Sequence, residues 1–209
     1  MKIPCVKGAI ALATLCFLMG CESSPRGPYV STGEQQHNPA KAEALYRDAV
    51  KRLHTAPADN NGDGDRAEAE SLLREALSYD LYHGPAHNNL GVLLLKQDHL
   101  YDAAEEFEWA RKLLPGNPEP RVNLAIALER GGKHVDAIEA AKSALEVAPG
   151  NLAAMQSIAW IQVRECLLDA STSELLAQIR NRSEQVQWRE WAGRNIILNR
   201  QDALISAPK

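Results

Sequence analysis

The sequence predicts an all-α fold, built as a stack of antiparallel helix pairs. The first observation is a tripeptide, Pro115-Gly116-Asn117, that returns as Pro149-Gly150-Asn151. A fixed period of about 34 residues is typical of stacked helical hairpins, because each unit repeats one packing problem. Alanine or glycine at a recurring position lets two helix backbones cross closely. The second observation is that the residues before the tripeptide return at the same interval, namely Leu90 with Leu124, Leu94 with Leu128, Ala103 with Ala137, and Ala110 with Ala144.

The repeated unit resembles the tetratricopeptide repeat, a 34-residue helix–turn–helix motif. With Gly84 as its first position, one unit places the family's marker residues at Leu90, Gly91, Leu94, Ala103, Phe107, Ala110 and Pro115. With Pro118 first, the next unit places them at Leu124, Ala125, Leu128, Ala137, Ala141, Ala144 and Pro149, where Ala141 stands in for a larger residue. The resemblance implies a right-handed α-solenoid of antiparallel helix pairs.

Weaker copies extend the array on both sides. We expect units at roughly 40–83, 84–117, 118–151 and 152–183, then a capping helix at 184–200, within a repeat domain of 40–205. The interval from Ala49 to Ala69 is longer by eight than that from Gly91 to Ala103, so an insertion is expected in the first inter-helix loop. The last unit has Ser171 and Gln178 where alanines should stand. Drift is expected there, because a terminal repeat has only one neighbour.

The last predicted helix carries an aromatic stripe. Ser183 is expected to cap its N-terminus, and Trp188, Trp191 and Ala192 fall on one face at i, i+3 and i+4 spacing. Such a stripe either covers the open end of the solenoid or forms an exposed docking site. We favour the covering role. Trp109 is predicted to face outward from a second helix and has no assigned role.

Composition excludes some classes of function. Residues 21–209 contain 21 Lys+Arg and 27 Asp+Glu, a net charge of −6, without a basic run. Phosphate binding needs clustered cations, so nucleic acid is not an expected partner. No catalytic triad, zinc spacing or glycine-rich phosphate loop occurs in the sequence, so we predict a protein that is not an enzyme. Cys166 is expected to be a small buried apolar residue rather than a reactive thiol.

The segment 1–20 resembles a lipoprotein signal peptide. Lys2 and Lys7 precede an uncharged apolar stretch that is too short to span a bilayer, which needs ~20 residues. The sequence Leu18-Met19-Gly20-Cys21 resembles the bacterial lipobox, which implies cleavage before Cys21 and a lipid on its sulfur; an ordinary secretory leader is the alternative. Glu22, rather than aspartate, favours the outer membrane, with the repeat domain in the periplasm. Residues 21–39 are rich in serine, proline and glycine, which predicts a flexible tether.

The first inter-helix loop fits the calcium pattern D-x-[DN]-x-[DN]-G-x₅-E. The pattern predicts Ca²⁺ ligands at Asp59, Asn61, Asp63, Asp65 and Glu70, with a sharp turn at Gly64. Arg66 departs from it, because the EF-hand family usually has an apolar residue there. The alternative is a solvated loop whose acids stabilise the N-terminus of the next helix. A structural Ca²⁺ is thus the one cofactor that the sequence suggests.

In the family that the repeat resembles, the first helix of each unit lines a concave groove. The resemblance implies a polar row of Asn89, Asn123 and Ser157, an apolar row of Val92, Ile126 and Trp160, and a cationic row of Lys96, Arg130 and Arg164. A peptide could lie along these rows and present an acidic feature to the cations. Alternatively, the cations serve the helix C-terminal dipoles. Asn123 and Ser157 stand where the family's carboxylate clamp has lysine or arginine, so that clamp is not expected.

These features together predict a lipid-anchored scaffold of the bacterial cell envelope that binds a protein or peptide partner in its concave groove. Two other functions stay open on the sequence. One is a calcium-stabilised structural envelope protein. The other is an accessory subunit of an envelope or pilus assembly machine.

Overall fold

The protein forms a stack of helix pairs. A computed structural model describes residues 37–55 and 63–206, with side chains described as far as Leu198. Within these residues every regular element is a helix. They are α1 (Pro39–Thr55), α2 (Asp63–Tyr79), α3 (Gly84–Lys96), α4 (Leu100–Leu113), α5 (Glu119–Arg130), α6 (His134–Val147), α7 (Leu152–Arg164), α8 (Thr172–Arg182) and α9 (Val186–Ser206). The predicted signal peptide, Cys21 and most of the tether lie outside the described residues, as do Asp59 and Asn61.

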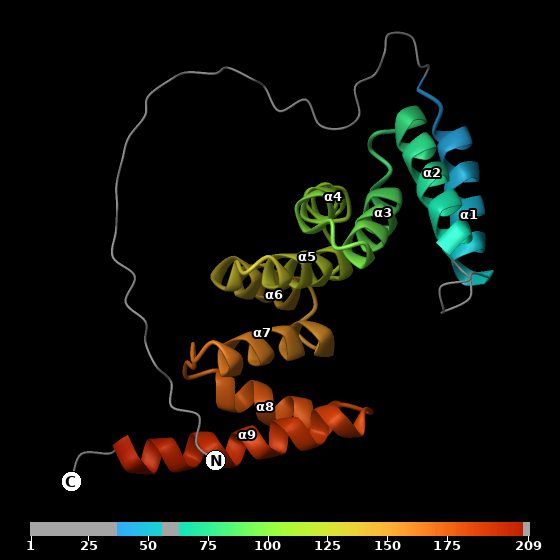
Figure 1. Cartoon of the computed structure of the whole chain (residues 1–209). Coiled ribbons are helices and arrows are strands. Elements are labelled where there is room, and N and C mark those ends of the chain that lie inside the picture. The colour runs from blue at the N-terminus through green and yellow to red at the C-terminus, as the bar shows by residue number, and fades with distance from the viewer. Residues whose placement is uncertain (1–36, 56–62, 207–209) are drawn as a thin grey trace, which may run out of the picture.

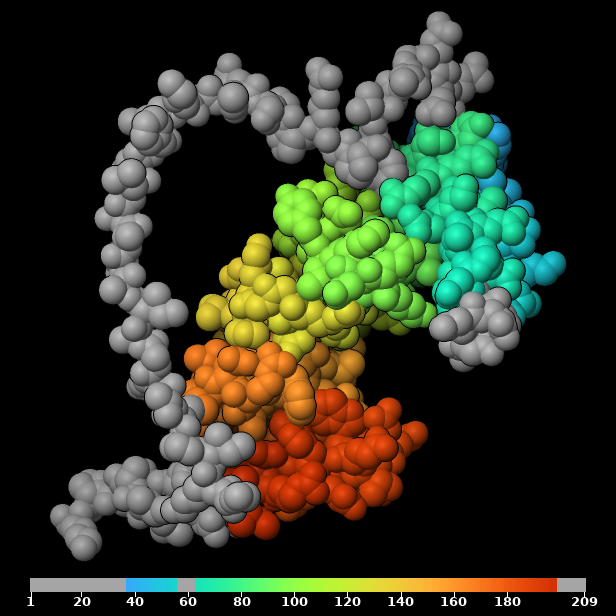
Figure 2. All heavy atoms as spheres, in the orientation of Figure 1, coloured from blue at the N-terminus to red at the C-terminus, as the bar shows by residue number. Residues whose placement is uncertain are grey.

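Successive helix pairs follow one another from one end of the molecule to the other (Figures 1 and 2). Each helix packs most extensively against its neighbours in sequence, and α3, α5 and α7 also contact one another in turn. Short connections between consecutive helices make them antiparallel. The prediction of an all-α solenoid of antiparallel helix pairs is therefore confirmed.

The recurring small residues lie where the helices cross. Ala103, Ala110, Ala137 and Ala144 are all fully buried. Gly91 on α3 is packed more tightly still, since a Cβ atom placed there would lie 2.6 Å from the ring of Phe107 on α4. The close crossing of α3 and α4 therefore depends on the absence of a side chain at this position.

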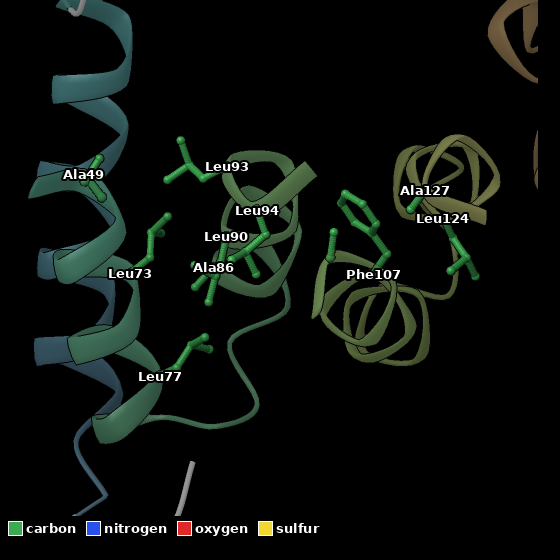
Figure 3. Packing of buried hydrophobic residues seen from close by; sticks show 12 residues of the cluster. Ala49, Leu73, Leu77, Ala86, Leu90, Leu93, Leu94, Phe107, Leu124 and Ala127 are labelled. Atoms are coloured by element: carbon green, nitrogen blue, oxygen red, sulfur yellow. The ribbon is translucent and has the colours of Figure 1, made fainter. Parts of the chain in front are cut away.

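The core is shared between consecutive pairs. One cluster of buried residues draws on α1 to α5, and Figure 3 shows Leu73 and Leu77 on α2 facing Leu90 and Leu94 on α3. A second cluster draws on α5 to α9. Because each cluster joins neighbouring pairs only, stability accumulates along the array from local interfaces.

The first pair has longer helices than the repeat requires. α2 begins at Asp63, well before the buried Ala69, whereas α4 begins at Leu100, less than one turn before Ala103. Part of the predicted insertion is thus helical and does not belong to the loop. Gly64 lies in the first turn of α2, so the predicted sharp turn is absent at that residue.

The connection from α7 to α8 explains the drift of the last unit. It spans residues 165–171, while the matching connections span 97–99 and 131–133. The longer connection moves the buried face of α8 by about one turn, to Thr172, Leu175, Leu176 and Ile179. The buried positions of this helix therefore no longer follow the spacing of the earlier repeats.

Cys166 is exposed, so the prediction that it is buried was wrong. It follows α7 and has a φ of 54°, in the left-handed region. Asp98 and Gly132, at φ of 66° and 75°, take the same conformation at the equivalent positions of the two preceding repeats. In these three repeats the position ends the first helix with a left-handed residue, as helix C-termini commonly do. The role of the position in the turn, rather than the apolar character of cysteine, determines its exposure.

The capping helix α9 begins later than predicted and continues to Ser206. Ser183 is the C-terminal cap residue of α8, so its predicted role as the N-cap of the last helix was wrong. The Arg189 guanidinium of α9 donates to the carbonyl oxygens of Ser183 and Glu184, at 3.1 and 2.9 Å. These bonds hold the short link between the two helices. In the part of the chain that the structure describes, no helix combines the length and apolar character needed to cross a bilayer.

Candidate functional site

The predicted groove residues lie on α3, α5 and α7, the first helices of three successive pairs. The polar row is already engaged within the chain. Asn89 bonds the side chain of Tyr46, and the Ser157 hydroxyl donates to the Ala153 carbonyl of its own helix at 3.0 Å. The Asn123 amide donates to the Asn88 side chain at 3.0 Å, which joins α5 to α3.

The apolar row divides into a core residue and two surface residues. Val92 packs against the first core cluster. Ile126 on α5 and Trp160 on α7 are 37% and 40% exposed, high fractions for such large apolar side chains. They border a cavity of about 330 Å³. Its lining residues are Val122, Ala125, Ile126, Glu129, Ala153, Gln156, Ser157, Trp160, Ile161 and Trp188.

Two tryptophans that line this cavity, Trp160 and Trp188, belong to a cluster of three with Trp191. Trp160 lies 6.3 Å from Trp188 and 5.7 Å from Trp191, measured between ring centroids. Trp188 and Trp191, both on α9, meet edge to face at 5.3 Å. The predicted covering role of the stripe is consistent with this packing, but Trp188 also lines the cavity. Sequence reasoning missed that second role, because no local pattern shows which inner helix α9 will meet.

Two members of the cationic row are paired with acids in the chain. The Arg130 guanidinium donates to the Leu95 carbonyl oxygen and to Asp98, both at 2.7 Å. Arg164 pairs with Glu129 and, at 2.7 Å, with Glu165. The Glu165 and Glu129 carboxylates raise the pKa of Arg164, and Arg164 lowers the pKa of Glu165.

These ion pairs connect successive repeats. Arg130 on α5 reaches back to the end of α3, and Arg164 on α7 reaches back to Glu129 on α5. Lys96 is exposed and lines a hollow between α2 and α3, together with Asp63 and Arg66. Two of the three predicted cations are therefore engaged in contacts between repeats.

Two of the described acids of the predicted calcium loop, Asp63 and Glu70, have partners in the chain. Asp63 forms an ion pair with Arg66 at 2.7 Å. The two oxygens of Glu70 accept bonds from Arg74 at 2.9 Å and from Gln97 at 2.8 Å. Burial alone would raise the pKa of Glu70, but these two bonds together with the charges of Arg74 and His99 lower it. Among the described residues no three His, Cys, Asp or Glu side chains are grouped as metal ligands, and the calcium site stays a prediction.

The opposite face holds a larger, more polar hollow of about 770 Å³ between α4 and α6. Trp109 lies there, stacked on His87 at 5.6 Å between ring centroids. His87 is fully buried; its Nε2 donates to the Leu81 carbonyl oxygen at 2.8 Å, and its Nδ1 lies 2.6 Å from Glu106. Both charge signs line this hollow, so its chemistry selects no ligand class.

Comparison with known sequences places the repeat within a family. Residues 88–151 match the profile of the tetratricopeptide repeat, and these residues carry the buried small positions and the α3–α6 geometry described above. No curated protein matches the chain in sequence. Residues 88–151 therefore match the tetratricopeptide repeat in sequence, and the described helices on either side continue the same stacked-pair fold.

Solved structures share the same fold. The crystal structure of MamA has a TM-score of 0.56 at 20% identity, over 68% of this chain and 75% of that chain. A MamA from Desulfovibrio magneticus RS-1 has a TM-score of 0.56 at 18% identity, over 68% and 78%. The first tetratricopeptide domain of Spaghetti (RPAP3), solved with an HSP90 peptide, has a TM-score of 0.55 at 17% identity, over 67% and 99%. At such identities the likeness shows the fold alone.

Proposed function

We propose that the protein is a non-enzymatic scaffold of the cell envelope that binds a protein or peptide partner through the concave face of α3, α5 and α7. The observation that carries the proposal is the apolar cavity between α5, α7 and α9, with Ile126 and Trp160 exposed at its border. Clustered exposed apolar side chains are expensive to keep in water, and in soluble proteins they commonly mark interaction sites.

The fold neighbours support a role in protein–protein interaction. The first tetratricopeptide domain of Spaghetti was solved with an HSP90 peptide, and the second domain of human RPAP3 with an HSP70 peptide. Tetratricopeptide-repeat proteins are in general interaction modules without catalytic activity. Peptide or protein binding of this kind would let this chain gather other envelope proteins.

The lipid anchor is the second part of the proposal. Leu18-Met19-Gly20-Cys21 has the lipobox order, and residues 22–36 would separate the helical stack from the bilayer. Each buried CH₂ contributes ~0.8 kcal/mol, so two or more acyl chains hold a protein at a membrane from which a single chain dissociates. Glu22 favours the outer membrane, with the repeats in the periplasm.

The proposal is tested by crosslinking in native membranes, followed by purification of the full chain with its partners. We expect Ile126→Asp to remove the partner, because it places a charge at the border of the apolar cavity. Val135→Asp is the matched control: Val135 is 65% exposed and lies on α6, away from this cavity. Equal recovery of the crosslinked partner by the two variants would contradict the proposed groove.

A further inference from the structure

We infer that the groove selects a peptide segment that carries a bulky apolar side chain and lacks acidic residues, and that this side chain enters the cavity between α5, α7 and α9. The inference rests on the proposed function and specifies the chemistry of the partner. It differs from the expectation, drawn from the sequence, that an acidic feature of the partner would be held by a cationic row.

The lining of the cavity favours an apolar anchor. Seven of its ten lining residues are apolar, namely Val122, Ala125, Ile126, Ala153, Trp160, Ile161 and Trp188. A volume of about 330 Å³ is at the small end of ligand pockets. It therefore suits one or two side chains rather than an extended polar surface. Anchors of this kind, placed in desolvated pockets, carry most of the binding free energy at many protein interfaces.

The tryptophan cluster holds the wall in place before a partner arrives. Trp160 packs against both Trp188 and Trp191, at centroid distances of 6.3 and 5.7 Å. Aromatic pairs with this geometry stabilise each other beyond their buried area. A wall that is already ordered loses little conformational entropy on binding, which favours affinity.

The charges at the cavity disfavour an acidic partner. Of the described residues that line it, Glu129 is the one with a formal charge, and that charge is negative. The nearest cation of the predicted row, Arg164, is balanced by Glu129 and Glu165. Arg130 is held by Asp98 and the Leu95 carbonyl oxygen. An incoming carboxylate would have to displace these partners, whereas a neutral or basic segment would not.

The test is selection of binders from a display library of random peptides on the full chain. We expect the selected peptides to be enriched in Phe, Leu, Ile or Trp and depleted in Asp and Glu. Ile126→Asp should weaken their binding about tenfold or more, and Val135→Asp should leave it unchanged. Ile126 lies outside the core clusters, so this variant should fold, which circular dichroism checks.

A second variant blocks the cavity without adding charge. Ala153 is exposed on α7 and lines the cavity, so Ala153→Phe should fill it and weaken the same peptides. Tryptophan emission gives an independent readout. Three of the four tryptophans belong to the cluster at the cavity, so in a Trp109→Phe background the emission should shift when a selected peptide binds.

The outcomes distinguish failure of the inferred peptide chemistry from failure of the proposed binding groove. Acidic peptides whose binding is weakened by Arg130→Gln but not by Ile126→Asp would overturn the inferred chemistry and leave the groove as the binding surface. Peptides that bind all these variants equally, or a library that yields no binder, would overturn both the inference and the proposed groove.

Discussion

At the scale of single residues, buried positions in this protein tolerate little change, because one atom decides whether neighbouring helices can meet. Gly91 illustrates this for side-chain volume, because it packs directly against the ring of Phe107. His87 and Glu106 illustrate it for polar groups, because both are buried and each depends on a partner inside the fold: His87 Nδ1 lies 2.6 Å from Glu106, and His87 Nε2 faces the Leu81 carbonyl, which can only accept.

Gly91→Ala should destabilise the protein, although alanine is by ~1 kcal/mol the better helix former. The added Cβ would lie 2.6 Å from the Phe107 ring, so α3 and α4 must separate, at about 1–3 kcal/mol. Gly64→Ala is the control: nothing lies within 4 Å of the new Cβ, and the propensity gain should raise the melting temperature. Chemical denaturation measures both. Stabilisation by both substitutions would mean that the α3–α4 crossing is looser than described.

Glu106→Ala should destabilise the fold by about 3–5 kcal/mol, because it leaves His87 buried beside an unfilled polar site. The double variant His87→Leu with Glu106→Leu should recover much of that loss, since it removes both polar groups together. The test compares the free energies of unfolding of the single and the double variant, measured by chemical denaturation. A double variant as unstable as the single one would show that the pair is not the source of the effect.

At the scale of elements, the short connections determine where the first helix of a repeat ends, and the last helix covers the end of the array. A left-handed residue at Asp98, Gly132 and Cys166 closes the first helix of three repeats at one fixed interval. The repeat is thus periodic in its turns as well as in its core. At the end of the array, α9 replaces a missing neighbour and buries Ala192 against the second core cluster.

Trp191→Ala should lower the free energy of unfolding by about 2–3 kcal/mol, because it removes packing between α9 and α7. Ile197→Lys, on the same helix but 60% exposed, should change it little. Thermal unfolding of the two variants distinguishes a covering helix from one that merely lies nearby. Similar melting temperatures for both variants would count against the covering role.

Calcium titration tests the predicted metal site at the start of α2. If Asp59, Asn61, Asp63, Asp65 and Glu70 bind Ca²⁺, millimolar Ca²⁺ should raise the melting temperature, and Glu70→Gln should abolish the increase. Glu70 would have to give up Arg74 and Gln97 in doing so. A midpoint unaffected by Ca²⁺ would leave the acids with the alternative role of stabilising the helix N-terminus.

At the scale of the whole molecule, α3, α5 and α7 contact one another in turn, and ion pairs join their repeats. Each arginine reaches back to the preceding repeat, so inner-face cations contribute to the alignment of repeats. In the proposed function, partner binding depends on the exposed Ile126 and Trp160 of this face, and membrane attachment depends on Cys21.

Cys21→Ser should move the protein from the membrane fraction to the soluble fraction, because serine cannot accept the thioether-linked lipid. Fractionation with detection of the full chain measures this, and melting temperature serves as a control that the helical stack is unchanged. A variant that still sediments with membranes would contradict the lipid anchor.

Much of the fold could be predicted because the same small and apolar residues recur at the same positions in several repeats, and each recurrence indicates the same helix packing. Ala103 on α4 and Ala137 on α6 were predicted to be buried at equivalent helix crossings, and both are buried. Cys166 could not be predicted in this way, since its exposure comes from a turn conformation that apolar character does not reveal. The groove rows follow the repeat, but the engagement of Arg130 and Arg164 depends on acids in other repeats or turns.

The sequence by itself determined the all-α solenoid and the positions of its small residues, because helix period and side-chain size are local properties that recur with every repeat. Only the tertiary structure decided that Trp188 completes the cavity with Ile126 and Trp160, and that the groove arginines are balanced within the chain. Those results depend on contacts between the repeats and residues outside the repeat pattern, such as those of α9. Such contacts leave no periodic signal in the sequence.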